Sequence, residues 1–412
     1  MRTELLEGPG GSRLVIQEDH SHPLVTVTAA YQGGQRWECA QDQGMTSLTQ
    51  RLLIKGTSRR SRDQLADDLE FLGAPFLPYC GKDTYGATLA VLSRHFRAGL
   101  AIMAECLGEP AFAQEEVEKE KSLLELERRR LADDSLKFAL EEVEKLLYDG
   151  HPYSLSSLGT LESLAAVSTG QLAGWHRRLF DRSRLTLAVV KDISPEAVKA
   201  QVDELFTWDG SPPPGLAASS CHPPDRDREQ VVCRERKQAT LALALLGPRF
   251  TAPDYAAFQV VQMVLAGMGG RLFAELRDRR GLGYLVNSSL ERRLDGSCFK
   301  AYVGTSEARA EEALEAMRAE IGRLAAEPVG LEELYRAKRY MLGLHEINLQ
   351  KKAYLAHQLA TYEALGLGYQ AFERFPEQVR AVTIEQVQQV AAQYLCRPGA
   401  LVRVLPAGQS GC

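Results

Sequence analysis

The sequence predicts an α+β fold: two homologous halves, each a mostly antiparallel sheet with helices packed on one face, facing each other across a cleft. Two observations favour this fold. Strand patterns occur in groups that are followed by blocks of helix patterns, which is typical of α+β proteins and not of alternating α/β proteins. The same order of elements also occurs twice along the 412 residues, on either side of a segment rich in proline, glycine and serine.

That segment, residues 208–229, reads WDGSPPPGLAASSCHPPDRDRE and shows no apolar periodicity. Such a composition favours turns and extended chain, so we predict a linker there. The linker separates an N-terminal α+β domain over residues 1–207 from a C-terminal α+β domain over residues 230–412. The length agrees with this division, because domains average ~150 residues.

The first half is predicted to begin with a strand and to continue through helices, a hairpin and longer helices. Apolar spacing of two indicates the strands and spacing of three and four indicates the helices. Ser168-x-x-Gln171 is a capping box, and Ser194 followed by Pro195 is typical of a helix start. In chain order we expect strand 24–31, helices 45–54 and 61–72, strands 75–80 and 84–92, helices 115–130 and 137–147, a helix after Ser168, strand 185–190 and a helix from Pro195.

The second half repeats this order. Its hairpin turns at Asp295-Gly296, and Thr383-x-x-Gln386 is a second capping box near its end. We expect strand 239–246, helices 253–266 and 271–279, strands 283–290 and 298–305, helices 308–326 and 331–349, a helix after Thr383 and strand 400–405.

Composition excludes several classes of partner and location. The net charge is −5 without a run of lysine and arginine, so we expect no nucleic acid to bind. No apolar stretch approaches the ~20 residues of a membrane helix, and the N-terminus lacks the apolar core of a signal peptide. The eight cysteines form no C-x-x-C pair and are expected to be scattered thiols in a reducing compartment. We therefore expect a cytoplasmic protein with no membrane association.

Four motifs, in order along the chain, indicate a family. The sequence resembles the insulinase/pitrilysin/mitochondrial processing peptidase family, in its short bacterial two-domain form. The family patterns are G-x-x-H-F-L-E-H-x-L-F-K-G-T, E-K-E-R-x-x-x-x-E-E, H-P-Y…x-G-T-x-E-S and S-R-L-F-x-x-L-R-x-x-x-G-L-x-Y. The matching segments here are GMTSLTQRLLIKGT at 44–57, EKEKSLLELE at 118–127, HPY at 151–153 with LGTLES at 158–163, and GRLFAELRDRRGLGY at 270–284.

The departure from the family lies in its zinc motif, H-x-x-E-H. In that motif two histidines hold the metal and a glutamate activates water. This chain has Ser47, Gln50 and Arg51 at those positions. A serine hydroxyl is a poor zinc ligand, glutamine takes no proton from water, and arginine has no lone pair to offer. We therefore expect no catalytic residue, no metal and no cofactor in this chain alone.

The resemblance implies that Glu127 matches the family's third zinc ligand and that Glu120 matches the upstream partner of that ligand. A buried carboxylate without a partner would cost several kcal/mol. The guanidinium of Arg51 suits a carboxylate, so we expect Arg51 to hydrogen-bond Glu127, with Glu120 as an optional second partner. The alternatives are that 45–54 is only a core helix and that the glutamates belong to a solvated helix face.

Arg277 and Tyr284 match an arginine and a tyrosine that, in the family, are thought to hold the substrate backbone and to stabilise the oxyanion. Some bacterial members divide these tasks between two chains. The resemblance therefore implies a non-catalytic, substrate-binding subunit of a heterodimeric zinc metallopeptidase. Its partner would be a homologous subunit that carries the zinc, and its substrate an unfolded peptide.

Rival interpretations remain open at this stage. Arg277 lies in a basic cluster and could be an ordinary surface arginine, and Tyr284 could be a half-buried strand residue. The chain could then be a structural paralogue that acts as a scaffold in a larger assembly, or a stand-alone peptide-binding protein. The presence of both Arg277 and Tyr284 favours the substrate-binding subunit, because a scaffold has no evident need of the pair.

Overall fold

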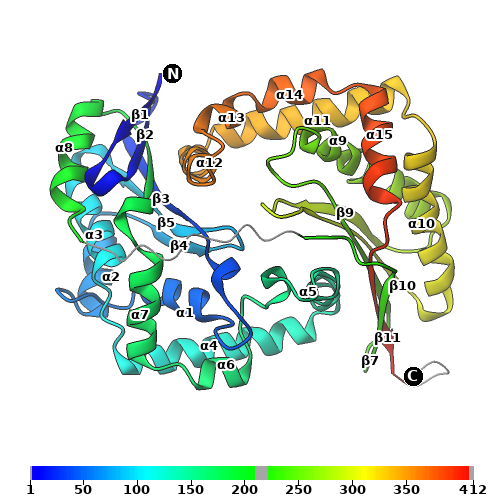
Figure 1. Cartoon of the computed structure of the whole chain (residues 1–412), viewed down its shortest axis with the longest axis horizontal. Coiled ribbons are helices and arrows are strands. Elements are labelled where there is room, and N and C mark those ends of the chain that lie inside the picture. The colour runs from blue at the N-terminus through cyan, green and yellow to red at the C-terminus, as the bar shows by residue number, and fades with distance from the viewer. Residues whose placement is uncertain (1, 209–220, 408–412) are drawn as a thin grey trace. The chain divides into compact units, whose positions relative to one another are not determined.

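The computed structural model describes residues 2–208 and 221–407, which form two compact units, each built around one sheet (Figure 1). Unit 1 contains the described residues of 1–127, 155–217 and 346–373, and unit 2 contains those of 128–154, 218–345 and 374–412. Neither unit is continuous in sequence, since each includes a helical segment from the other half of the chain. Most of the predicted linker, 209–220, lies outside the described residues, and the predicted domain ranges stay a prediction.

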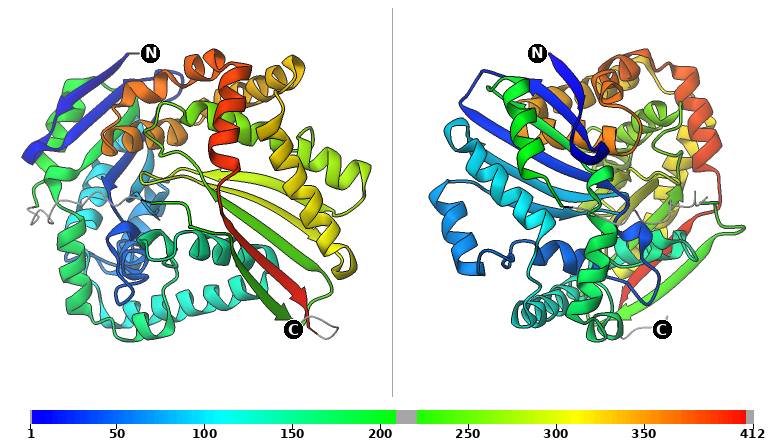
Figure 2. Two further views of the ribbon diagram at one scale, coloured as in Figure 1. Left: turned by 45° about the vertical axis from the view of Figure 1, so that its right-hand side comes forward. Right: turned by 60° about the vertical axis from the view of Figure 1, so that its left-hand side comes forward.

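Unit 1 has a six-stranded sheet in the order β1-β2-β6-β3-β5-β4. All neighbouring strands are antiparallel except β2 and β6, which are parallel. The strands are β1 Thr3–Glu7, β2 Arg13–Glu18, β3 Leu24–Gln32, β4 Phe76–Cys80, β5 Thr84–Leu92 and β6 Thr186–Lys191. Two further views show the twist of each sheet (Figure 2).

The helices of unit 1 cover both faces of this sheet. Alternate residues of β3, such as Val25 and Val27, belong to the main core together with α1, α3, α7 and α8. The intervening residues Thr26 and Thr28 are also buried, and α12 packs against β3 and β6. The helices are α1 Met45–Leu52, α2 Arg62–Phe71, α3 Phe96–Gly108, α4 Gln114–Asp133, α6 Leu161–Ala165, α7 Thr169–Leu179, α8 Pro195–Leu205, α12 Lys352–Ala364 and α13 Tyr369–Glu373.

Unit 2 has a five-stranded sheet in the order β7-β11-β8-β10-β9, with one parallel pair, β7 and β11. The strands are β7 Arg228–Arg234, β8 Ala239–Leu246, β9 Leu285–Glu291, β10 Cys298–Thr305 and β11 Ala400–Pro406. This order and these directions repeat those of β2, β6, β3, β5 and β4 in unit 1. The internal repeat predicted from the order of the elements is therefore visible strand by strand.

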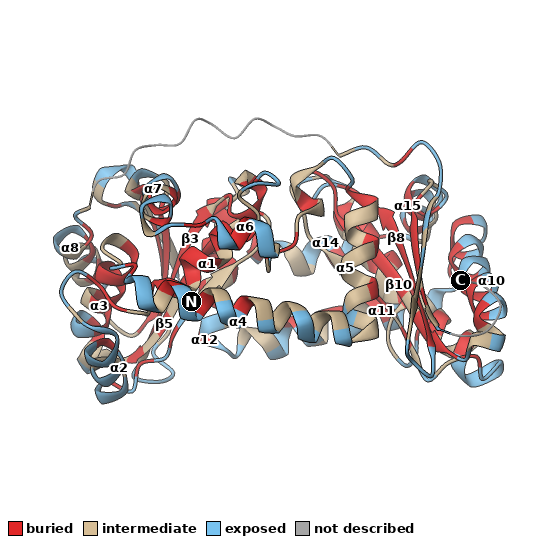
Figure 3. Ribbon diagram, turned by 90° about the horizontal axis from the view of Figure 1, so that it is seen from below, coloured by how far each residue is buried: buried red, intermediate tan, exposed pale blue. Residues whose placement is uncertain are grey.

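Helices also cover both faces of the second sheet. One face of β8 packs in the main core of unit 2, and the other packs with Ala139 and Val143 of α5. Figure 3 shows the buried strands β8 and β10 between α5 on one side and α10 and α15 on the other. The helices are α5 Ser135–Leu147, α9 Tyr255–Leu265, a π-helix Phe273–Arg279, α10 Ala310–Ala326, α11 Leu331–Leu349, α14 Phe375–Ala381 and α15 Ile384–Leu395.

The predicted α+β class with two sheets is confirmed, and the predicted strands and helices lie within a few residues of those observed. Helices were expected on one face of each sheet, but the structure has them on both faces, with α12 and α5 on the second faces. The capping boxes at Ser168 and Thr383 form as expected. The predicted helix 271–279 differs, because residues 273–279 form a π-helix and not an α-helix. Elements that the patterns did not indicate are β1, β2, β7, α3, α6, α12, α13 and α14. Within the described ranges, no helix has the length and apolar character that a bilayer span requires.

Candidate functional site

The start of α1 is held by a buried carboxylate. The backbone N–H groups of Gly44 and Thr46 donate to Oε2 and Oε1 of Glu38 at 3.0 and 2.7 Å. The first N–H groups of a helix have no partner within the helix, so Glu38 satisfies donors that would otherwise be unpaired. Burial raises the pKa of Glu38 to about 7, although the two N–H groups act in the opposite direction.

The motif segment LGTLES at 158–163 supports the same helix start. A Cβ on Gly44 would lie 2.7 Å from Cα of Gly159, so the two glycines allow their backbones to touch. Ser163 donates to the carbonyl of Gln43 at 2.7 Å and forms a capping box with Thr160 at the start of α6. These contacts use no metal, and they give the segment a structural role.

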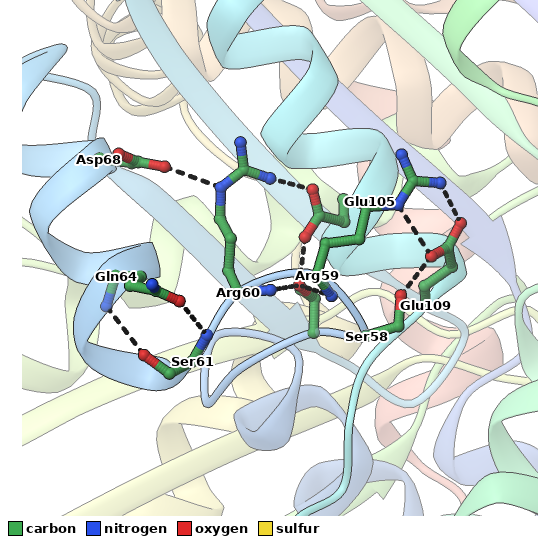
Figure 4. A network of polar contacts seen from close by, with 9 residues as sticks. Ser58, Arg59, Arg60, Ser61, Gln64, Asp68, Glu105 and Glu109 are labelled. Atoms are coloured by element: carbon green, nitrogen blue, oxygen red, sulfur yellow. Dashed lines mark hydrogen bonds and ion pairs between the residues drawn. The ribbon is translucent and has the colours of Figure 1, made fainter.

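The Lys-Gly-Thr segment at 55–57, after α1, also has a structural role. Figure 4 shows the polar network beside it, in which Arg60 lies between Glu105 and Asp68. Gly56 adopts a φ of 112°, which favours glycine. The hydroxyl of Thr57 donates to Glu105 on α3 and accepts the backbone N–H groups of Arg59 and Arg60 at 3.2 and 3.0 Å. Arg60 in turn bridges Glu105 and Asp68 of α2. The segment therefore fixes the end of α1 to its neighbouring helices without a contribution from zinc chemistry.

Between these two ends, Arg51 joins α1 to α4. Its Nη1 donates to Oε1 of Glu127 at 2.9 Å, and its Nη2 donates to Oε2 at 2.6 Å. This two-point contact confirms the hydrogen bond that the sequence predicted. The bond to Glu127 is the largest factor that raises the pKa of Arg51 above its ordinary value, while burial lowers it. Two parallel N–H···O bonds of this kind fix orientation as well as distance.

Glu120 has a different main partner, which the sequence analysis missed. Its Oε1 lies 2.8 Å from Nζ of Lys55, whereas its Oε2 lies 3.9 Å from Nη1 of Arg51. Glu120 is 3% exposed, so this pairing compensates for the burial of its charge. Lys55 and Arg51 are four residues apart, and Glu120 and Glu127 are seven apart. Two positive charges on one segment and two negative charges on the other were the signal in the sequence, although the two spacings differ.

The residues at this place do not fit a zinc ion. Both oxygens of Glu127, the carboxylate at the ligand position, are already bound to the Arg51 guanidinium, and Ser47 is the remaining residue at a former ligand position. Across residues 2–208 and 221–407 no group of three or more His, Cys, Asp or Glu side chains could hold a metal ion. The arrangement is an interhelical ion pair and has no means to activate water.

The burial of the Gln50 side chain is not offset by hydrogen bonds within the described residues. It is 2% exposed, and among the described residues its amide nitrogen and oxygen have no hydrogen-bond partner. A glutamate at the same place would bury a charge without a partner, which is more costly than burying a neutral amide. A neutral amide is therefore the less costly of the two side chains at this buried position.

Arg277 and Tyr284 lie together in unit 2. Arg277 is on the π-helix, and Gly281, with a φ of 59°, turns the chain from that helix toward β9. Nη1 of Arg277 donates to the backbone oxygen of Tyr284 at 3.3 Å, and its Cζ lies 4.7 Å from the ring centroid of Phe273. Tyr284 is 61% exposed, and its hydroxyl donates to Oε1 of Gln238 at 2.8 Å.

The guanidinium of Arg277 keeps donors for another molecule. In the described part of the chain no carboxylate forms an ion pair with it, because the nearby Glu275 is bound by Arg279 and Arg280 at 2.9 and 2.8 Å. These bonds, with Arg280 the larger factor, hold the pKa of Glu275 below its ordinary value. A forked set of N–H donors beside a phenol hydroxyl can bind peptide carbonyl groups.

Phe273 and Gln238 are members of this cluster that the sequence analysis missed. Phe273 stands four residues before Arg277, one helical turn away, and that spacing was a usable signal. Gln238 is 46 residues from Tyr284 and precedes a strand that is separated from β9 by β10. No local pattern could have indicated it.

Two family models and several related proteins match this chain. The family model described as insulinase (peptidase family M16) matches residues 13–161, and the model described as peptidase M16 inactive domain matches residues 166–341. An uncharacterized zinc protease of Bacillus subtilis (strain 168) is 23% identical over 400 residues, which cover 97% of each chain. One of Mycobacterium leprae (strain TN) is 25% identical over 397 residues, which cover 94% of this chain and 88% of the relative.

Two solved structures share the fold. The peptidase M16 inactive domain from Pseudomonas fluorescens superimposes with a TM-score of 0.92 at 23% identity, covering 100% of this chain and 99% of that chain. A protease from Helicobacter pylori superimposes with a TM-score of 0.90 at 18% identity, covering 98% and 99%. At these identities the likeness establishes the fold alone.

We predict that Arg51→Met destabilises the protein by about 2 kcal/mol, between the values typical of exposed and of fully buried pairs. The reason is that Glu127 loses its partner and Glu120 loses a nearby positive charge. Denaturant unfolding measures the loss. A double-mutant cycle with Glu127→Gln should give a coupling energy of about 1 kcal/mol or more.

Arg97→Met is the matched control for this measurement. Arg97 also contacts a glutamate, Glu204, through two hydrogen bonds, but both side chains are more than half exposed. Its loss should be much smaller, because water screens the exposed pair. If Arg51→Met is no more destabilising than Arg97→Met, Arg51 is not the bridge between α1 and α4.

A second prediction concerns pH and Glu38. The folded protein holds a proton on Glu38 with a pKa of about 7, whereas the unfolded chain releases it near the ordinary value of 4.5. Folding is therefore favoured by this group below pH 4.5, and that contribution is lost as pH rises to 7, by about 3 kcal/mol in total. Unfolding free energies of the wild type and of Glu38→Gln, measured from pH 5 to pH 8, should differ by an amount that changes with pH. Parallel curves would contradict the assignment.

Proposed function

Because the chain belongs to the insulinase (M16 peptidase) family, in its short form, we propose that it is a non-catalytic, substrate-binding subunit of a heterodimeric zinc metallopeptidase. In this proposal it pairs with a homologous chain that carries an intact H-x-x-E-H motif and the zinc. Arg277 and Tyr284 complete the active site of that partner. The proposal rests on one contrast within this chain. The side chains around Arg51 are bound to one another, whereas Arg277 and Tyr284 keep hydrogen-bonding groups at the surface.

In the first site, around Arg51, the charged side chains are paired with one another. Arg51 and Lys55 neutralise Glu127 and Glu120, so the residues that would face a metal in an active relative are bound to one another. Ion pairs of this kind hold α1 against α4 but present no group that could attack a peptide bond. Hydrolysis by the assembly must therefore depend on another chain.

The second site is open. The Arg277 guanidinium has unused donors and lies over the Phe273 ring, and Tyr284 is exposed. An unfolded peptide fits these groups, because its backbone carbonyls are free to accept hydrogen bonds, whereas those of a folded protein are mostly satisfied. In a peptidase the same donors would stabilise the negative charge that develops on the scissile carbonyl oxygen.

A structural scaffold is the rival function, and the two functions predict different results for the same variants. We expect the purified chain alone to cleave no peptide. When a homologous H-x-x-E-H chain from the same genome is added, an internally quenched fluorogenic peptide should be hydrolysed. Arg277→Ala or Tyr284→Phe should then lower kcat/KM roughly tenfold to a thousandfold, the range for the loss of an oxyanion donor.

The matched controls are Arg279→Ala, a neighbouring exposed arginine bound to Glu275, and Tyr335→Phe, an exposed tyrosine of α11. Both should leave turnover unchanged. Sedimentation velocity should show that all four variants still associate with the added chain. If Arg277→Ala and Tyr284→Phe are as active as these controls in an intact complex, the pair has no role in catalysis and the scaffold is favoured.

A further inference from the structure

We propose that Gln238 is a positioning residue for Tyr284, and that the orientation of its side-chain amide decides whether the phenol donates to the substrate or accepts from it. This inference rests on the proposed function and deepens it, because it states how one hydroxyl could be prepared to stabilise an oxyanion. It follows from the geometry of the Tyr284–Gln238 contact and from the hydrogen-bonding capacity of the two groups.

The contact spans a strand. Tyr284 comes directly before β9, and Gln238 comes directly before β8, while β10 runs between those strands. The Tyr284 ring passes beside Gly304 of β10, where a Cβ would lie 3.9 Å from its Cε1 and 3.3 Å from Cβ of Leu285. A Cβ at Gly304 would be in ordinary van der Waals contact with the ring, so β10 lies directly beside it, and the fixed register of three strands sets the distance from Tyr284 to Gln238.

The protons in this contact can be counted. The Tyr284 hydroxyl donates its single hydrogen to Oε1 of Gln238 at 2.8 Å. The phenol oxygen is then left with lone pairs only and can accept from a peptide N–H, but it cannot donate to a carbonyl oxygen. An oxyanion requires a donor. In this orientation Tyr284 can bind the substrate backbone but cannot stabilise the charge that develops during hydrolysis.

Rotation of the Gln238 amide by half a turn reverses the contact. The amide carries a donor and an acceptor on the same carbon, and its terminal torsion is broad and roughly two-fold. After rotation, Nε2 donates to the phenol oxygen and the phenol hydrogen is released toward the substrate. Among the described residues the amide nitrogen of Gln238 makes no hydrogen bond, so the rotation breaks no other contact. We infer that the donating orientation is the productive one.

Two substitutions of similar size separate this role from a structural one. Gln238→Glu can only accept at neutral pH, so it should hold the phenol hydrogen permanently. Gln238→Leu can neither accept nor donate, so it leaves the phenol free to turn toward the substrate. A residue that merely supports the loop would respond more strongly to leucine, whereas a positioning residue responds more strongly to glutamate.

The test uses the reconstituted complex and the fluorogenic peptide described above, with Tyr284→Phe as the reference. Gln238→Glu should lower kcat roughly tenfold or more, close to Tyr284→Phe, with little change in KM. Gln238→Leu should lower kcat only about two- to threefold. The double variant Gln238→Glu/Tyr284→Phe should be no slower than Tyr284→Phe alone, because both changes remove the same donor.

The outcomes distinguish this inference from the proposed function. If Tyr284→Phe is slow while Gln238→Glu matches the wild type, or is no slower than Gln238→Leu, only the role of Gln238 is overturned. If the effects of Gln238→Glu and Tyr284→Phe multiply in the double variant, Gln238 acts elsewhere and the inference also fails. If Tyr284→Phe itself keeps full activity, the proposed function fails and the inference fails with it.

Discussion

The ion pair between Arg51 and Glu127 is the interaction that joins α1 to α4 in unit 1. α1 carries Ser47, Gln50 and Arg51 at the motif positions, α4 carries the two glutamates, and the Arg51–Glu127 hydrogen bonds join the two helices. Carboxylates in such a place must be neutralised, and in a metal-binding relative a cation does so. Here a guanidinium with two parallel hydrogen bonds to Glu127, and the ammonium of Lys55 on Glu120, supply the positive charge. The other residues of the motif segments have structural roles that need no metal.

The two units thus use arginine side chains for different purposes. In unit 1, arginine is neutralised by carboxylates on a packed helix, and its donors are consumed within the protein. In unit 2, Glu275 is occupied by two other arginines, which leaves Arg277 exposed beside Tyr284 and Phe273. One unit therefore uses its arginine donors within the protein, and the other leaves arginine donors exposed. In the proposed function those exposed donors bind the substrate, and a homologous chain supplies the metal.

Much of this could be predicted from the sequence, and the failures have physical causes. Strands with period-two patterns and helices with capping boxes were found because their signals are local. The contact from Arg51 to Glu127 was predictable for two reasons. The family motifs identify both positions, and the two side chains carry opposite charges. α12 was missed because it is buried on most sides and has little amphipathic pattern, and Gln238 was missed because sheet order, not sequence distance, brings it to Tyr284. The π-helix around Arg277 also lacks a sequence signal.

The most direct test of the central claim is to restore the ligands on the retained frame. The triple variant Ser47→His/Gln50→Glu/Arg51→His removes the guanidinium and returns both imidazoles to one helical turn, so Glu127 becomes available as the third ligand. Elemental analysis after dialysis should find about one zinc per chain in the folded triple variant and none in Gln50→Glu alone, with an unfolding temperature that rises when zinc is added. A folded triple variant that binds no zinc would contradict the claim that α1 and α4 still hold the geometry of the metal site.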